Sequence, residues 1–336
     1  MKVGIGKVSL VPNFNANSAK AFFSKYVLEC ILLVLIILLA FFQSGFMTPD
    51  NLLNILRNMS LQGVIAFGMT MVIISAEIDL SIGSTVALTG VIIAGLTGML
   101  AKQGIPMEYG VLIGMVAAFI IAGVIGLFSG YLLTIIKMPS FIITLGLQIL
   151  LYGVAAVLCN GFPLTTLPEW YNNIGAGQVF GVIPVPAIIL LLVFAIVFVI
   201  MNYTKFGRSV YAVGGNVESA RLSGVNVNFV KTAALVIVQL CSALAGILVS
   251  AQVMSGNFTF GKGWEMIAIS SCIIGGTSIF GGIGKVWGTL IGLIFIGVII
   301  NGMTLLNIPE FWQYIVRGGL ILFAVLVNTL QTRQKT

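Results

Sequence analysis

The chain is dominated by repeated apolar runs, 14 to 28 residues long, that are separated by short polar segments. A helix needs about 20 mostly apolar residues to cross the hydrocarbon core of a bilayer. Because lipid leaves no partner for unpaired backbone polar groups, such runs are expected to be helical. Only 7% of the 336 residues are charged, against about 25% in an ordinary soluble domain. The sequence therefore predicts an all-α, polytopic membrane protein without a soluble domain.

The charged residues, prolines and glycines that bound these runs predict about ten transmembrane helices. The expected spans cover residues 26–42, 61–75, 82–100, 109–136, 141–158, 185–201, 232–253, 266–279, 286–306 and 314–330. The spans 61–75 and 266–279 are short, so each could be broken or re-entrant. Together the spans are expected to form one transmembrane domain over residues 26–330, between an N-terminal tail at 1–25 and a C-terminal tail at 331–336.

Basic residues predict the orientation. When the N-terminus is placed in the cytoplasm and the intervening segments alternate, 12 of the 16 basic residues fall inside. They are Lys2, Lys7, Lys20, Lys25, Lys137, Lys205, Arg208, Arg221, Lys231, Lys285, Arg333 and Lys335. The positive-inside rule expects this excess. Both termini are then cytoplasmic, which requires an even number of spans, and eight spans remain the alternative if neither short run crosses.

The composition argues against an enzyme. The chain has no histidine, which excludes Ser-His-Asp and Cys-His arrangements. The nearest match to a phosphate-binding loop, residues 256–262, is followed by Gly263 where the Mg²⁺-binding Ser or Thr should stand. We therefore expect no cofactor, metal or nucleic acid on this chain. Four cysteines without C-x-x-C spacing are expected to be free thiols: Cys30, Cys159, Cys241 and Cys272.

Polar residues in or beside the expected spans are candidates for a polar route through the helices. They are Gln62, Thr70, Glu77, Asp79, Gln148 and Asn301. Each could equally form a hydrogen bond between helices. Asp79 follows the span 61–75 closely, so it could instead stabilise the start of the next helix.

In the last span, Arg317 lies two helical turns from Glu310, which favours a charge pair or a snorkelling arginine.

Pairs of glycines four residues apart recur in the spans and favour close packing of helices. They are Gly110 and Gly114, Gly126 and Gly130, and Gly288 and Gly292.

Residues 202–231 form a longer polar segment with four basic residues and one glutamate, which the orientation above assigns to the cytoplasm. In this segment Gly214, Gly215 and Asn216 predict a turn before a short helix.

Several motifs closely resemble the permease subunits of ABC importers for monosaccharides, of the ribose, xylose and galactoside type. Three lie in the 202–231 segment: Phe-Gly-Arg at 206–208, Tyr-Ala-Val-Gly-Gly-Asn at 211–216 and Ala-Arg-Leu-Ser-Gly-Val-Asn-Val at 220–227. Further matches lie at residues 68–73, 78–84, 141–146, 275–278, 312–314 and 317–318. The similarity extends from about residue 52 to residue 326.

The resemblance implies a permease subunit that translocates a monosaccharide or related polyol across the bacterial cytoplasmic (inner) membrane. Its implied partners are a cytoplasmic ABC ATPase subunit, a second permease copy that is identical or closely related, and a periplasmic or lipid-anchored sugar-binding protein, within membrane lipid. ATP and Mg would be bound by the partner ATPase. No nucleic-acid partner is implied.

Residues 218–224 also resemble the E-A-A-x-x-x-G coupling motif, whose short helix docks into a groove on the ATPase. On that basis the expected coupling residues are Gly214, Gly215, Asn216, Glu218, Ala220, Arg221, Ser223 and Gly224. An ordinary basic loop is the alternative. Family members commonly read Y-E-L-D-A-I-A-A at residues 264–271; here Glu265 is kept but Ile267 replaces the aspartate, so the resemblance names no particular sugar.

A stand-alone, ion-coupled secondary carrier of a small polar solute is the alternative function. Such a carrier needs titratable or ion-coordinating groups near the middle of the bilayer, commonly at broken helices. Glu77 and Asp79 are the acidic pair nearest to an expected helix break. The two hypotheses therefore differ in the function of Glu77 and Asp79, because only the ion-coupled carrier needs such groups to bind an ion or a proton.

Overall fold

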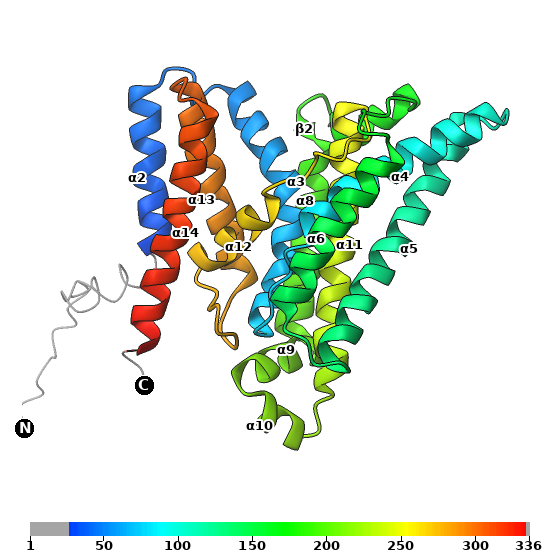
Figure 1. Cartoon of the computed structure of the whole chain (residues 1–336). Helices are drawn as coiled ribbons and strands as arrows, with labels where there is room; N and C mark the ends of the chain where they lie inside the picture. Colours follow the sequence, from blue (N-terminus) through cyan, green and yellow to red (C-terminus); the bar gives the residue numbers. More distant parts are fainter. Residues whose placement is uncertain (1–26, 334–336) are drawn as a thin grey trace, which may run out of the picture.

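The computed structural model describes residues 27–333, which fold almost entirely into helices (Figure 1). The long helices are α2 (Val27–Phe42), α3 (Pro49–Ile74), α4 (Ile82–Lys102), α5 (Met107–Thr134), α6 (Ser140–Leu158), α8 (Val185–Tyr203), α11 (Val227–Val253), α13 (Val286–Leu305) and α14 (Glu310–Arg333). The shorter ones are η1 (Glu169–Tyr171), α7 (Asn172–Gly175), α9 (Lys205–Gly215), α10 (Val217–Leu222) and α12 (Trp264–Ile274). Strands β1 (Gln178–Val179) and β2 (Ile183–Pro184) pair antiparallel.

Seven helices among the described residues are long and apolar enough to cross a bilayer, judged by length and composition: α3, α4, α5, α6, α8, α11 and α13. The apolar part of α2 and all of α12 fall short of that length. The helical membrane fold is thus confirmed, whereas ten spans and the side on which the termini lie stay predictions. Of the expected tails, residues 1–25 lie outside the described residues, and α14 continues to Arg333, past the expected boundary at 330.

The expectation for residues 61–75 is wrong, because they are the second half of the continuous helix α3. Its first half carries Asn51, Asn54, Arg57 and Asn58, and these polar residues hide the helix from a search for apolar runs. Residues 266–279 do contain a short helix, α12, but it ends at Ile274 and not at 279, and a broken or re-entrant course for this segment stays a prediction. Helix α12 has 11 residues, about 16 Å at 1.5 Å per residue, and ends before Gly276, whose φ is +88°.

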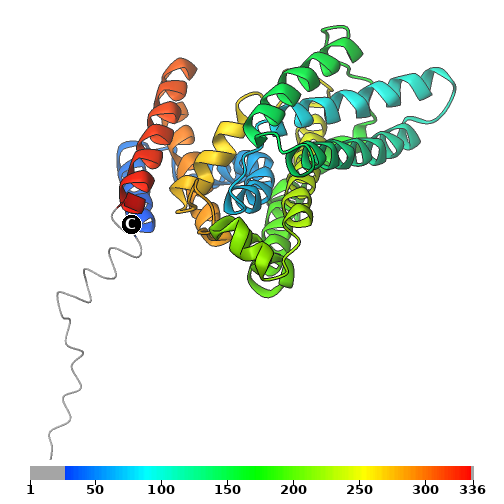
Figure 2. The same cartoon turned by 60° about the horizontal axis from the view of Figure 1, so that its bottom comes forward.

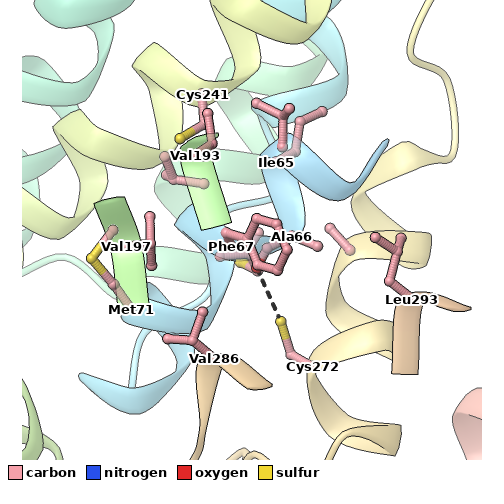
Figure 3. Close-up of a cluster of buried hydrophobic side chains, with 14 of the residues drawn as sticks. Ile65, Ala66, Phe67, Met71, Val193, Val197, Cys241, Cys272, Val286 and Leu293 are labelled. Carbon is pink, nitrogen blue, oxygen red and sulfur yellow. Dashed lines mark hydrogen bonds between the residues drawn. The ribbon is translucent and has the colours of Figure 1, made fainter. Parts of the chain in front are cut away.

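Helix α3 is the centre of the molecule. Figure 2 shows it between one group formed by α2, α13 and α14 and another formed by α4, α5 and α6. Its residues from Gly63 to Ile74 are all buried. Side chains from α8, α11, α12 and α13 pack against it in one apolar cluster (Figure 3). In this cluster the Cys272 thiol donates a 3.4 Å hydrogen bond to the carbonyl oxygen of Ala66. The four cysteines are free, as expected.

Paired glycines provide the close contacts between helices, as the sequence predicts. On α5, a Cβ at Gly114 would lie 2.8 Å from the Cα of Ile93 on α4, and one at Gly126 would lie 2.6 Å from the Cα of Val236 on α11. On α13, Gly288 and Gly292 meet the backbone of Gly275 and Ser271. Since lipid tails are as apolar as the helices, this close packing is a main source of helix association.

We expect Gly126→Val to lower the melting temperature of the detergent-solubilised protein, because the new side chain would enter the backbone of α11. Overpacking a well-packed contact costs about 1–3 kcal/mol. Gly123→Val is the matched control, since Gly123 lies on the same helix and a Cβ there meets nothing within 4 Å. Equal melting temperatures for the two variants would show that the α5–α11 contact does not depend on Gly126.

Candidate functional site

The 202–231 segment folds into two consecutive short helices at one end of the molecule (Figure 1). Helix α10 is capped at its N-terminus by Asn216, whose side-chain oxygen accepts a 2.8 Å hydrogen bond from the backbone N–H of Ser219. It ends in a left-handed turn at Gly224, where φ is +81°. The backbone N–H of Val225 then bonds to the carbonyl oxygen of Ala220 at 3.1 Å. The predicted short helix is therefore confirmed, but Gly214 and Gly215 are the last two residues of α9 rather than part of a turn, and the break between the two helices lies at Asn216. Asn216 and Gly224 both follow ordinary capping chemistry.

Helix α10 presents almost all of its side chains to the outside. Glu218 and Arg221 form an exposed ion pair at 2.7 Å, which contributes little to stability. Leu222 is 80% exposed, although it lies at a polar end of the molecule. Among the expected coupling residues, Ala220 is buried and anchors α10 to the rest of the chain. An exposed short helix with an apolar tip is a surface suited to a protein partner.

The inner side of α9 touches two segments at once. Gly214 lies directly against the carbonyl oxygen of Ile74, at the end of α3, and against the backbone of Gly282. The carbonyl oxygen of Ile74 accepts a 2.9 Å hydrogen bond from the N–H of Gly282. The Tyr211 hydroxyl donates a 3.0 Å hydrogen bond to the carbonyl oxygen of Gly284. Burial raises the pKa of the Tyr211 phenol, because desolvation disfavours the charged phenolate.

The contact between α9, Ile74 and residues 281–284 is called the junction below. No side chain could be added at Gly214 without displacing the backbone of α3. Gly215, by contrast, has open space where a Cβ would lie. Displacement of α9 would therefore be passed to α3 and to the α12–α13 connection through backbone contacts rather than through flexible side chains.

The acidic pair lies near this end, and both carboxylates have partners. Glu77 forms a largely buried ion pair with Lys231 at 2.5 Å. Asp79 is fully buried and accepts hydrogen bonds from the Ser81 N–H at 2.8 Å and from the Gln239 side-chain amide at 2.8 Å. Helix α4 begins directly after Ser81. Asp79 thus stabilises the start of α4 and joins it to α11. This favours stabilisation of the next helix over a place in a polar route.

Thr70 and Gln148 also connect helices. The Thr70 hydroxyl bonds to the Thr289 hydroxyl at 2.8 Å, which joins α3 to α13. The Gln148 amide donates a 2.9 Å hydrogen bond to a carboxylate oxygen of Glu265, which joins α6 to α12. The other carboxylate oxygen of Glu265 is buried without a hydrogen-bond partner. Neither Thr70 nor Gln148 lines the cavity between α3, α13 and α14 that is described next.

Gln62 and Asn301 line the same cavity, of about 130 Å³, between α3, α13 and α14. Its polar lining also includes Asn54, Asn58, Thr304 and Arg317, and its apolar lining is Ile55, Met59, Leu293, Ile296, Gly297 and Ile300. Asn54, Asn58 and Thr304 were not among the residues expected from the sequence. Asn54, Asn58 and Gln62 recur every four residues, so their shared helical face is the signal that identifies them.

Arg317 does not form the charge pair that is one of its two expected arrangements. Within the described part of the chain, Glu310 and Arg317 form no ion pair, because Tyr314 lies between them. The Tyr314 hydroxyl donates to Glu310 at 3.0 Å, and the Arg317 guanidinium lies over the Tyr314 ring, 5.7 Å from its centre. The Nε of Arg317 is buried without a hydrogen-bond partner. The guanidinium therefore borders the cavity with unused hydrogen-bonding capacity.

Comparison with known proteins assigns the chain to a family. Residues 51–325 match the family described as "Branched-chain amino acid transport system / permease component". The ribose import permease protein RbsC of Haemophilus influenzae is 39% identical over 308 residues, covering 90% of this chain and 93% of that protein. RbsC of Escherichia coli is 38% identical over 301 residues, covering 88% and 91%.

A more distant relative, the xylose transport system permease protein XylH of Haemophilus influenzae, is 30% identical and covers 89% of this chain and 95% of its own length. No solved structure matches the chain. The location expected from the sequence, a multi-pass protein of the inner membrane, is confirmed by these relatives together with the seven candidate spans. The chain belongs to the permease-component family of ABC transporters, whose members act with an ATPase and a substrate-binding protein.

Proposed function

We propose that this chain is the membrane-spanning subunit of an ATP-driven importer for a monosaccharide or related polyol. The similarity to ribose import permeases over about nine tenths of both chains carries the proposal. Relatives named for xylose and L-arabinose support the same class of solute, since ribose, xylose and arabinose are all pentoses. The solute would be delivered by an extracytoplasmic binding protein, and pentoses are the first solutes to test.

In this proposal the ATPase docks on α9 and α10. ATP and Mg are bound by that partner, and this chain has no nucleotide site and catalyses no reaction. The exposed face of α10 and the backbone contacts of the junction support this coupling route. Closure of the ATPase pair would push α9, and rigid packing would pass the movement to α3 and to the start of α13.

The proposed topology has ten crossings and cytoplasmic termini. It is supported by Figure 1, in which the first described residues of α2 and the last of α14 lie at the same end as α9 and α10. The basic residues Lys205, Arg208 and Arg221 lie at that end as well. The assembly would contain a second permease copy, and lipid would cover the exposed apolar faces of α5 and α6.

Purification of the tagged chain from native membranes in mild detergent, followed by reconstitution into liposomes, tests the proposal. We expect a nucleotide-binding subunit to copurify in stoichiometric amount. Uptake of D-ribose, D-xylose or L-arabinose should then require ATP and the binding protein. Uptake by the chain alone that is abolished by a protonophore and independent of ATP would instead establish an ion-coupled carrier.

We expect Gly224→Asp to abolish ATP-driven uptake while the protein stays in the membrane. The substitution places a side chain in the left-handed region and a negative charge at the C-terminal end of α10, where the helix dipole is also negative. Gly224→Asn is the matched control, because asparagine has the same shape, tolerates this conformation and carries no charge. Wild-type uptake and binding-protein-stimulated ATP hydrolysis in Gly224→Asp would contradict the role of α10.

The Glu77–Lys231 pair distinguishes the two transport mechanisms. We expect Lys231→Met to destabilise the protein by about 3–5 kcal/mol, because it leaves Glu77 largely buried and unpaired. The double variant Glu77→Gln/Lys231→Met should recover most of the lost melting temperature and retain ATP-driven uptake. Stable double-variant protein without any uptake would show that the Glu77 carboxylate takes part in transport.

A further inference from the structure

The cavity between α3, α13 and α14 combines polar and apolar walls. Three amides lie on one face of α3, at Asn54, Asn58 and Gln62, and Asn301 and Thr304 face them from α13. The remaining wall is formed mainly by aliphatic side chains and Met59. Its volume of about 130 Å³ is far larger than one buried water needs. It can therefore hold a small solute that has both hydroxyl edges and C–H faces.

Much of the hydrogen-bonding capacity of this lining is unused. Asn301 exchanges hydrogen bonds with Asn51 at 2.7 and 3.0 Å, and Asn58 donates to Asn54 at 3.1 Å. The Gln62 side chain forms no hydrogen bond with any other described residue, although an amide offers two donors and an acceptor with two lone pairs. The buried Nε of Arg317 adds a further free donor.

The charge of the lining selects the class of ligand. No carboxylate lines the cavity among the described residues, which disfavours a cation. Arg317 is the one cationic side chain in the lining, and it is partly engaged with the Tyr314 ring. Amides both donate and accept hydrogen bonds, and so do hydroxyl groups. A neutral polyol fits this lining better than an anion, which needs donors alone.

Two helices that border the cavity or its neighbour, α12 and α13, are joined by the segment that contacts α9 at the junction. A second cavity, of about 20 Å³, shares Ile296 and Arg317 with it and extends past Ser270 of α12. Helix α12 leads directly into residues 275–285, which contact α9 through Gly282 and Gly284. Helix α13 starts after these residues and supplies one wall of the cavity. Movement at the junction would therefore change the relative positions of the cavity walls.

We infer that this cavity is a site at which the chain itself binds the transported polyol, with Gln62 and Arg317 as solute-contacting residues. The inference rests on the proposed function and assigns its solute-binding position within the permease. It separates Gln62 from the other polar residues considered above, because Thr70, Glu77, Asp79 and Gln148 hold helices together and Asn301, although it lines the cavity, is bonded to Asn51 of α3. Solute hydroxyls would use the free amide of Gln62, and the aliphatic wall would cover the C–H face.

The test uses the complete transporter in liposomes, with D-ribose, D-xylose and L-arabinose as probes. Gln62→Met keeps the length of the side chain and removes its hydrogen bonds. We expect the maximal uptake rate to fall about tenfold, while ATP hydrolysis stimulated by the loaded binding protein stays at the wild-type level. Gln103→Met is the matched control, since Gln103 is exposed at the end of α4, and it should transport normally.

A second measurement does not depend on turnover. Gln62→Cys is made in a Cys30→Ser background, because the other three cysteines are buried. A water-soluble thiol reagent should label Gln62→Cys, and a saturating pentose should slow this labelling at least fivefold. Labelling of Gln103→Cys should be insensitive to the sugar.

Wild-type uptake by Gln62→Met, or labelling of Gln62→Cys that anionic phospholipid slows and pentose does not, would overturn the inference. In both cases ATP-driven uptake by the unmodified transporter would leave the proposed function standing. If the unmodified transporter took up none of the three pentoses, the proposed function and the inference would fall together.

Discussion

The structure depends on the burial of one helix, α3, and on what its last carbonyl groups meet. From Gly63 to Ile74 the helix is enclosed by α8, α11, α12 and α13. Movement of any of these neighbours would therefore displace α3. At its end the carbonyl oxygen of Ile74 bonds to the N–H of Gly282 and lies against Gly214. Three segments that are far apart in sequence therefore meet through their backbones at a single point.

This backbone contact makes a mechanical account of transport possible. Side chains can change rotamer and absorb a displacement, whereas a carbonyl group in contact with a glycine cannot. The same connection, residues 275–285, precedes α13, which forms one wall of the polar cavity. The surface that is proposed to receive the ATPase and the cavity that is proposed to receive the solute are thus linked by rigid elements. Such links favour movement of whole helices over local adjustment.

The polar groups inside the protein divide into two kinds. Asp79, Glu77 and Thr70 are satisfied by partners on neighbouring helices, which is how buried polar groups usually stabilise a membrane bundle. Gln62 and Arg317 retain free donors beside a cavity. Satisfied groups hold the fold together, and unsatisfied groups beside open space can bind a ligand. This difference cannot be read from residue type, because both kinds contain amides and charges.

What the sequence by itself determined is therefore what depends on neighbours along the chain. Apolar runs predicted the helices, paired glycines predicted the close contacts of α5 and α13, and Asn216 predicted the start of α10. The true length of α3 was missed because hydropathy averages over a window, and the asparagines of its first half lower that average. Only the tertiary structure decided which polar residues share a cavity. Gln62 and Asn301 line one cavity because α3 and α13 pack side by side, and no local pattern encodes a contact between helices so distant in sequence.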